Sequence, residues 1–76
     1  MTSAELIGAI GAALFGSRYQ QDLAEALGVN RRTVSRWASG EDEPGAGVWL
    51  DLLGIMWERR RELGALIRTV EQHGFG

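Results

Sequence analysis

The chain has 76 residues, no cysteine and a formal net charge of −2. A chain of this length forms one domain with a modest core and leaves little room for a catalytic cleft beside it. Without cysteine, a disulfide framework and a thiolate metal site are excluded. We therefore expect a small binding module rather than an enzyme, with no catalytic residues, no metal, no cofactor and no small-molecule ligand.

The N-terminal segment and the lengths of the apolar runs indicate where in the cell the protein is expected. Residues 1–15 contain apolar side chains but no basic leader, and Glu5 lies among them, so we do not expect a signal peptide. No apolar run approaches the length of a membrane-spanning helix. We expect a soluble, cytoplasmic protein of bacterial or phage origin that contacts no membrane.

The first predicted helix covers about residues 3–15. Thr2 and Glu5 have the spacing of a capping box, and apolar residues recur at helical intervals through the segment. Gly8 and Gly11 weaken this helix by up to about 1 kcal/mol each relative to alanine. We therefore expect tertiary contacts, rather than helix propensity, to hold it.

Two short helices are predicted next, over about residues 20–27 and 31–39. Gly28 is placed as a left-handed stop after the first, and Asn30 as the N-cap of the second, which ends before Gly40. Only residues 28–30 connect the two helices. Because so short a connection forces the helices to cross steeply, the geometry is that of a helix-turn-helix unit.

The C-terminal third predicts one long helix. Residues 48–71 contain no proline and follow a loop that holds Pro44, the only proline. The alternative is a short helix and a longer one with a break near Gly54, and we favour the continuous helix. Residues 73–76 are expected to form a frayed tail. The predicted fold class is all-α: a compact helix-turn-helix domain of four to five helices with a long C-terminal helix.

The segment from Gln20 to Trp37 resembles the helix-turn-helix of the lambda-repressor and Cro-like family. In that family a small residue lies where the two helices touch, a glycine makes the turn, and two apolar residues anchor the second helix to the core. Residues compatible with this packing are Ala24, Gly28, Val34, Trp37, Leu23, Leu27 and Val29. The resemblance is strong over residues 17–40 and implies a regulator that binds double-stranded DNA.

The predicted helix 31–39 has a basic outward face. A helix advances about 100° per residue, which places Ser35, Arg32 and Arg36 within about 140° of Arg31, while the apolar residues lie on the opposite side. This face carries no acidic residue although the chain as a whole is acidic. The alternative explanation is an amphipathic helix with a solvated polar face, and the exclusive use of arginine over lysine fits a GC-rich genome equally well.

The resemblance implies that this face contacts base edges in the major groove. The residues implied to do so are Arg31, Arg32, Arg36 and Ser35. Arg32 and Arg36 are the strongest candidates, and for Arg31 a phosphate contact is the alternative. Since arginine can donate two hydrogen bonds to guanine, a contact worth roughly 1–3 kcal/mol of discrimination, we expect guanines in each half-site.

The start of helix 20–27 matches the place where the family holds a backbone phosphate with an amide and a helix N-terminus. Tyr19 departs from the serine or threonine that is common at its position, which leaves the N-cap open, with Ser17 as one source. The residues expected to contact phosphate are Gln20, Asn30, Arg18, Ser17 and Thr33.

Apolar residues of the C-terminal helix follow alternating steps of four and three, the spacing of a coiled-coil seam. Three of them are expected to pack on the chain's own core: Trp49, Leu53 and Met56. Beyond Arg59 the helix outruns that core, so its apolar residues need a partner, for which a second copy of the same helix is the simplest. The expected dimer interface is Met56, Arg60, Leu63, Leu66, Ile67 and Val70. Residues 59–61 form either a solvated cluster paired with Glu58 and Glu62 or an extra phosphate contact.

A homodimer would contact two half-sites about 34 Å apart, so the expected operator is an inverted repeat. We assign residues 1–47 to the DNA-binding core, with its helix-turn-helix unit at about 20–39, and residues 48–72 to core packing and dimerisation within the same domain.

Promoter occlusion, including that of its own promoter, is the simplest mechanism. Short Cro-like repressors of phages and mobile elements, among them autoregulators encoded beside anti-CRISPR genes, are similar in size and architecture. The alternative function is an antitoxin-like adaptor with the helix-turn-helix as scaffold, for which the arginine face would be dispensable.

Overall fold

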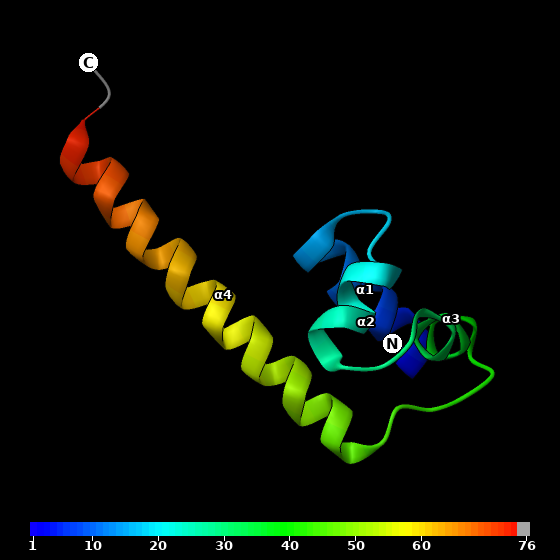
Figure 1. Ribbon diagram of the computed structural model, residues 1–76. Coiled ribbons are helices and arrows are strands. Elements are labelled where there is room, and N and C mark those ends of the chain that lie inside the picture. The colour runs from blue at the N-terminus through cyan, green and yellow to red at the C-terminus, as the bar shows by residue number, and fades with distance from the viewer. Residues whose placement is uncertain (75–76) are drawn as a thin grey trace.

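The computed structural model describes residues 1–74, and within that range it contains four helices and no strand. They are α1 (Ser3–Phe15), α2 (Gln20–Leu27), α3 (Arg31–Ser39) and α4 (Ala46–His73). Helices α1–α3 form a compact head, and α4 begins beside it and extends well past it, which gives the described molecule dimensions of 50 × 24 × 23 Å (Figure 1). The predicted all-α class is confirmed. No helix in this range is long and apolar enough to cross a membrane.

The ends of α1, α2 and α3 lie where the sequence predicts them. The backbone N–H of Thr2 donates to the Glu5 carboxylate at 3.0 Å and the N–H of Glu5 donates to the Thr2 hydroxyl at 3.1 Å, which completes the capping box of α1. Gly28 ends α2 in the left-handed conformation, with φ at +71°. Its φ lies in the region that glycine enters at no steric cost, and this lets the chain turn sharply into α3.

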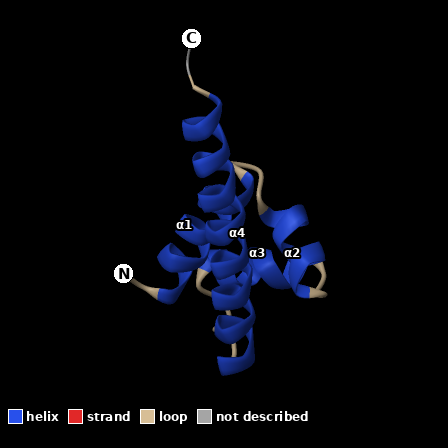
Figure 2. Ribbon diagram, turned by 90° about the vertical axis from the view of Figure 1, so that its left-hand side faces the viewer, coloured by secondary structure: helices blue, strands red, loops and turns tan. Residues whose placement is uncertain are grey.

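The core draws on all four helices. The N-terminal helix and α2 supply the fully buried Ile7 and Leu23, while α3 and α4 supply Val34 and Leu52. The remaining buried apolar residues are Ile10, Ala24 and Trp37. Because α3 has Val34 and Trp37 in the core, its opposite face must point outward. Figure 2 shows α4 crossing the head, with α1 to one side and α2 and α3 to the other.

Helix α4 is continuous through Gly54, as the sequence favours, and exceeds the predicted range by two residues at each end. The expectation that Leu53 packs on the core is wrong, because its side chain is 48% exposed and Leu52 is fully buried instead. Adjacent residues differ by about 100° around a helix, so the inward stripe passes through Trp49, Leu52 and Met56. Trp49 and Met56 are partly buried against the core, as expected.

A tyrosine accounts for the glycines inside α1. Gly11 is buried, and a Cβ added there would lie 2.1 Å from Cδ2 of Tyr19; one added at Gly8 would lie 3.7 Å from the Tyr19 hydroxyl oxygen. The ring of Tyr19 therefore lies directly over Gly11, a tertiary contact of the kind expected to hold this helix. Tyr19 is also the N-cap residue of α2, where no side chain makes a capping hydrogen bond, so the alternative of Ser17 as the cap is wrong.

Candidate DNA interface

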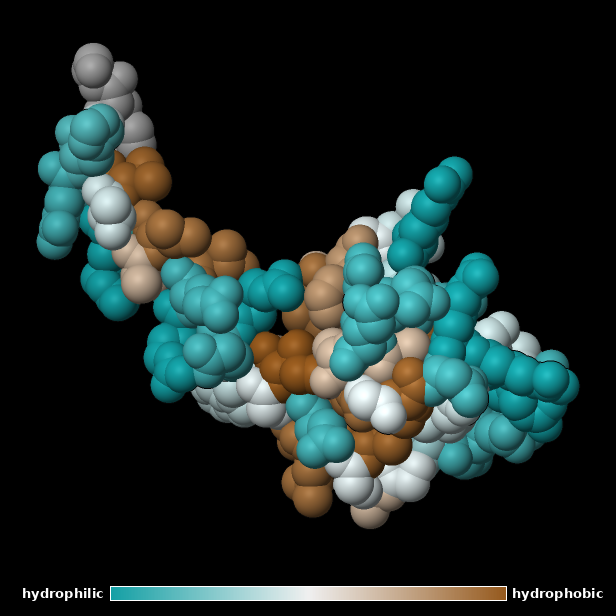
Figure 3. All heavy atoms as spheres, viewed as in Figure 1, coloured by the Kyte–Doolittle hydropathy of each residue, from teal (hydrophilic) through white to brown (hydrophobic). Residues whose placement is uncertain are grey.

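The outward face of α3 is fixed by the residues behind it. Val34 and Trp37 lie in the core, and Arg31, Arg32 and Ser35 on the other side of the helix are exposed. Because α3 is held by its own core residues, these outward side chains start from a rigid backbone. Hydrophilic side chains cover this part of the head in the space-filling view (Figure 3). The structure therefore places three of the four predicted base-contacting residues together on one accessible face.

Two adjoining shallow hollows join this face to the start of α2. The first is lined by Ser17, Arg18, Gln20, Gln21 and Arg31. The second is lined by Gln20, Arg31, Arg32 and Ser35. Every lining side chain carries a hydrogen-bond donor, and none is acidic, which suits an oxygen-rich anion such as a phosphate. Residues predicted separately from α2 and α3 therefore form one surface.

Gln21 is the one lining residue that the sequence analysis did not select. Its side-chain amide donates to the Glu25 carboxylate at 3.0 Å, one turn further along α2. Its place beside Gln20, at the start of a helix that is expected to face phosphate, is the signal that would have included it.

Asn30 and Thr33 are hydrogen-bonded to each other at the start of α3. The side-chain oxygen of Asn30 accepts from the backbone N–H of Thr33 at 2.9 Å and from the Thr33 hydroxyl at 3.0 Å. Asn30 is thereby the N-cap of α3, as predicted. The side-chain N–H groups of Asn30 stay available for a phosphate oxygen, whereas the Thr33 hydroxyl already donates to the cap.

Arg36 differs from the other arginines of α3. Its Nε donates to Asp42 at 2.7 Å and one Nη donates to Glu41 at 2.9 Å. The hydrogen bond from Arg36 holds the pKa of the Asp42 carboxyl below its usual value, and the hydrogen bond and negative charge of Asp42 raise the pKa of Arg36. The sequence analysis found no acidic residue on this face and missed that Gly40, with φ at +83°, turns the chain back so that these carboxylates reach Arg36.

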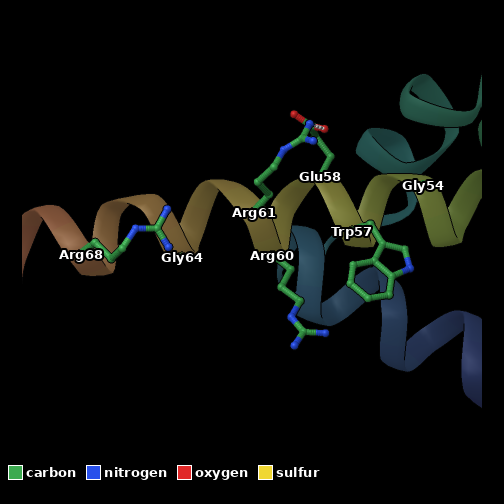
Figure 4. Close-up of a pocket in the computed structure, with 7 residues that line it drawn as sticks. All are labelled: Gly54, Trp57, Glu58, Arg60, Arg61, Gly64 and Arg68. Carbon is green, nitrogen blue, oxygen red and sulfur yellow. Dashed lines mark hydrogen bonds and ion pairs between the residues drawn. The ribbon is translucent and has the colours of Figure 1, made fainter.

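The three consecutive arginines of α4 make three different contacts. Arg59 donates to the backbone oxygen of Leu14 at 3.0 Å and lies over the ring of Phe15, with 5.6 Å from its guanidinium carbon to the ring centroid. Arg60 lies over the ring of Trp57 at 5.1 Å. Arg61 pairs with Glu58 on the opposite side of the helix (Figure 4). The predicted pairing with Glu58 is thus confirmed for Arg61, and Arg59 instead fastens α4 to the end of α1.

Beyond Arg59 the inward stripe of α4 continues without a core beneath it. Four large apolar side chains there are between 51% and 61% exposed: Leu63, Leu66, Ile67 and Val70. Figure 3 shows hydrophobic side chains along the side of α4 that faces the head, continuing past it toward the C-terminus. Of the other two residues predicted for the dimer interface, Arg60 is exposed and Met56 is partly buried on the chain's own core.

The family comparison agrees with this geometry. Residues 19–55 match the model of the helix-turn-helix family, and this segment spans α2, α3 and the first part of α4. No match was found among curated proteins or among solved structures. The matched segment contains the buried contacts between α2 and α3 and the left-handed turn at Gly28 that joins them. Residues 19–55 therefore form a helix-turn-helix segment of the lambda-repressor and Cro-like type, a family of DNA-binding proteins.

Proposed function

We propose that the chain is a homodimeric transcriptional repressor that binds an inverted-repeat operator with α3 in the major groove, including an operator at its own promoter. The observation that carries the proposal is the exposed outward face of α3, which adjoins the donor-lined hollows at the start of α2. The resemblance in size to short phage repressors, some encoded beside anti-CRISPR genes, supports an autoregulatory role in the cytoplasm.

Base contacts are proposed for the side chains on this face. Arg32 and Ser35 are exposed and line the hollow next to α2, so a duplex seated there would meet both. Arg31 lines both hollows, and we propose that it binds either a base or a phosphate. We also assign Arg36 to base contact, from its position one turn further along α3. A guanine opposite any of these arginines would accept two hydrogen bonds through N7 and O6.

Phosphate contacts are proposed for the rim of the same surface. Ser17, Arg18 and Gln20 line the first hollow beside the N-terminus of α2, where free backbone N–H groups and the helix dipole both favour an anion. Asn30 would add its side-chain amide, and Thr33 would reach phosphate only by exchanging its hydrogen bond to Asn30. These contacts would set the register of α3 without selecting sequence.

A second copy of α4 is proposed to cover the exposed stripe. An apolar hollow lies between the end of α1 and the stripe, lined in part by Ala13, Leu14, Leu63 and Ile67. Several large apolar side chains on one side of a helix are costly to leave in water, and a symmetric dimer would bury both copies at once. We accordingly propose that residues 1–47 bind DNA and that residues 48–72 pack on the core and dimerise.

The DNA-binding proposal is tested by fluorescence anisotropy on two probes. One is a duplex from upstream of the protein's own gene, and the other is a duplex selected by the wild type from a random pool. Arg32→Ala is expected to weaken binding to the bound duplex by roughly 1–3 kcal/mol relative to random DNA. Arg68→Ala removes the same charge from an exposed position far along α4 and is the control. Absence of tight binding to either probe would favour the adaptor alternative.

The dimer proposal is tested by sedimentation. Leu66→Asp places a charge on the exposed stripe and is expected to give a monomer with weaker operator binding. Ala65→Asp, one position away and about 100° around the helix, introduces the same charge off the stripe and is expected to leave the dimer intact. Equal effects of the two substitutions would contradict the proposed interface.

A further inference from the structure

Arg36, Glu41 and Asp42 form a unit within the proposed interface that we call the acidic clamp. Two of the guanidinium nitrogens of Arg36 donate to one carboxylate each, at 2.7 and 2.9 Å. The side chains of Arg36, Glu41 and Asp42 are 40%, 58% and 51% exposed, so the unit lies at the surface where DNA would arrive. Within residues 1–74, neither Arg31 nor Arg32 makes an ion pair.

The loop that carries the two carboxylates is anchored to the same arginine. The backbone oxygen of Arg36 accepts from the backbone N–H of Glu41 at 3.0 Å and of Asp42 at 3.2 Å. It also accepts from the Ser39 hydroxyl at 3.1 Å. These bonds close the C-terminal end of α3, and Pro44 is buried two residues further along. Because backbone hydrogen bonds hold both acidic residues next to Arg36, the fold itself brings the two carboxylates within reach of the guanidinium group.

We propose that Asp42 and Glu41 are specificity-determining residues, which hold Arg36 for a base contact while they cancel its attraction to the phosphate backbone. The proposal rests on the proposed binding of α3 in the major groove. An arginine and two carboxylates together carry a net charge of −1, so the clamp as a unit does not favour phosphate at random sites. A free arginine in its place would be drawn to phosphate at any site, which would strengthen binding to random DNA more than binding to the operator, where Arg36 is already engaged with a base.

The clamp leaves Arg36 able to contact a base. A guanidinium group has five N–H donors. Two are used by the carboxylates, and a guanine needs only two of the remaining three. The rotamer freedom that a free arginine loses on binding is already reduced by the two ion pairs, which lowers the cost of a specific contact. The outward face thus combines unpaired arginines at the start of α3 with one positioned, neutralised arginine a turn later.

The acidic clamp is expected to raise the preference of the protein for its operator over random DNA, without blocking DNA binding by Arg36. Ion pairs between exposed groups contribute little net free energy, so DNA can compete for Arg36 at small cost. Removing the clamp should therefore strengthen binding to random DNA roughly three- to tenfold, with less gain on the operator. The specificity ratio, which is the ratio of the two affinities, should fall.

The test uses the full chain and isosteric substitutions. Asp42→Asn, Glu41→Gln and their combination are compared with Glu43→Gln, which removes the same charge from the next position, where no ion pair to Arg36 exists within residues 1–74. Affinities for the wild-type-selected duplex and for a random duplex of equal length are measured across a salt series. We expect the double variant to lower the specificity ratio beyond the Glu43→Gln control. Its salt dependence on random DNA should correspond to about one additional phosphate contact per protomer.

A second comparison isolates the role of Arg36. In an Arg36→Ala background, the clamp substitutions should behave like Glu43→Gln, because their effect passes through the arginine. If the clamp variants match the control in the wild-type background, or raise both affinities equally, the specificity role is refuted while DNA binding stands. If the wild type selects no duplex at all, the proposed function fails and this inference fails with it.

Discussion

Replacing Gly11 by alanine should destabilise the protein although glycine to alanine changes inside helices usually stabilise. Helix propensity alone favours alanine by about 1 kcal/mol. At Gly11, however, the new Cβ would lie 2.1, 2.4 and 2.6 Å from three ring atoms of Tyr19, closer than real Cβ atoms come to their neighbours. Moving a packed ring aside costs about 1–3 kcal/mol, and subtracting the propensity gain of about 1 kcal/mol leaves a net loss of up to about 2 kcal/mol. For a domain of this size, such a loss lowers the melting temperature by up to about 16 °C.

Gly8→Ala on the same helix is the matched control. Its Cβ would lie 3.7 Å from the Tyr19 hydroxyl oxygen, an ordinary contact, so the propensity gain of up to about 1 kcal/mol should appear in full. Urea unfolding followed by circular dichroism, at one protein concentration, measures both free energies. In a Tyr19→Ser background the ring is gone, and Gly11→Ala should then stabilise. If both glycine substitutions stabilise the protein with Tyr19 present, the argument from ring packing is refuted.

Three further predictions concern the core, the clamp and α4. Leu52→Ala should cost about 2–5 kcal/mol of unfolding free energy, whereas Leu53→Ala should change it by less than about 0.5 kcal/mol; equal losses in urea unfolding would contradict the assigned stripe. Because Arg36 lowers the pKa of Asp42, the stabilisation from their pair is present above the unfolded-state pKa and disappears as the pH falls through the lower folded-state pKa. Carboxyl NMR titration should show the pKa of Asp42 returning to its ordinary value in Arg36→Ala. In hydrogen exchange, amides of residues 60–73 should gain protection as protein concentration rises, since a free helix of about 14 residues is marginal in water.

The parts of the fold that follow from local rules could be predicted from the sequence. Capping by Thr2 and Asn30, and left-handed stops at Gly28 and Gly40, depend on residues within one turn of each helix end. Those signals therefore located the ends of α1, α2 and α3. The outward face of α3 was equally local, because helical periodicity separates Arg32 from Val34 whatever packs behind them.

The parts that depend on distant contacts could not be predicted in the same way. The choice between Leu52 and Leu53 is set by the angle at which α4 meets the head, and a seam that drifts around the helix fits either residue. The ring of Tyr19, the N-cap residue of α2, packs on Gly11 of α1, and only the structure reveals this contact between separate segments. The clamp on Arg36 was missed for a similar reason, since it depends on the direction in which the chain leaves Gly40.

The charge distribution links the clamp to the need for a dimer. With Arg36 neutralised, the cations on the proposed interface are Arg18, Arg31 and Arg32, none of which makes an ion pair within residues 1–74. If each of these cations released one phosphate counterion, the logarithm of the binding constant of a single protomer would fall with the logarithm of salt concentration with a slope of only about −3. For two protomers on one operator the slope would be about −5. Since the chain is acidic overall, one protomer gains little from electrostatic attraction alone. Under the proposed function, affinity would then come from two aligned copies of α3 and from base contacts, which would make the exposed stripe of α4 as necessary for recognition as the arginines themselves.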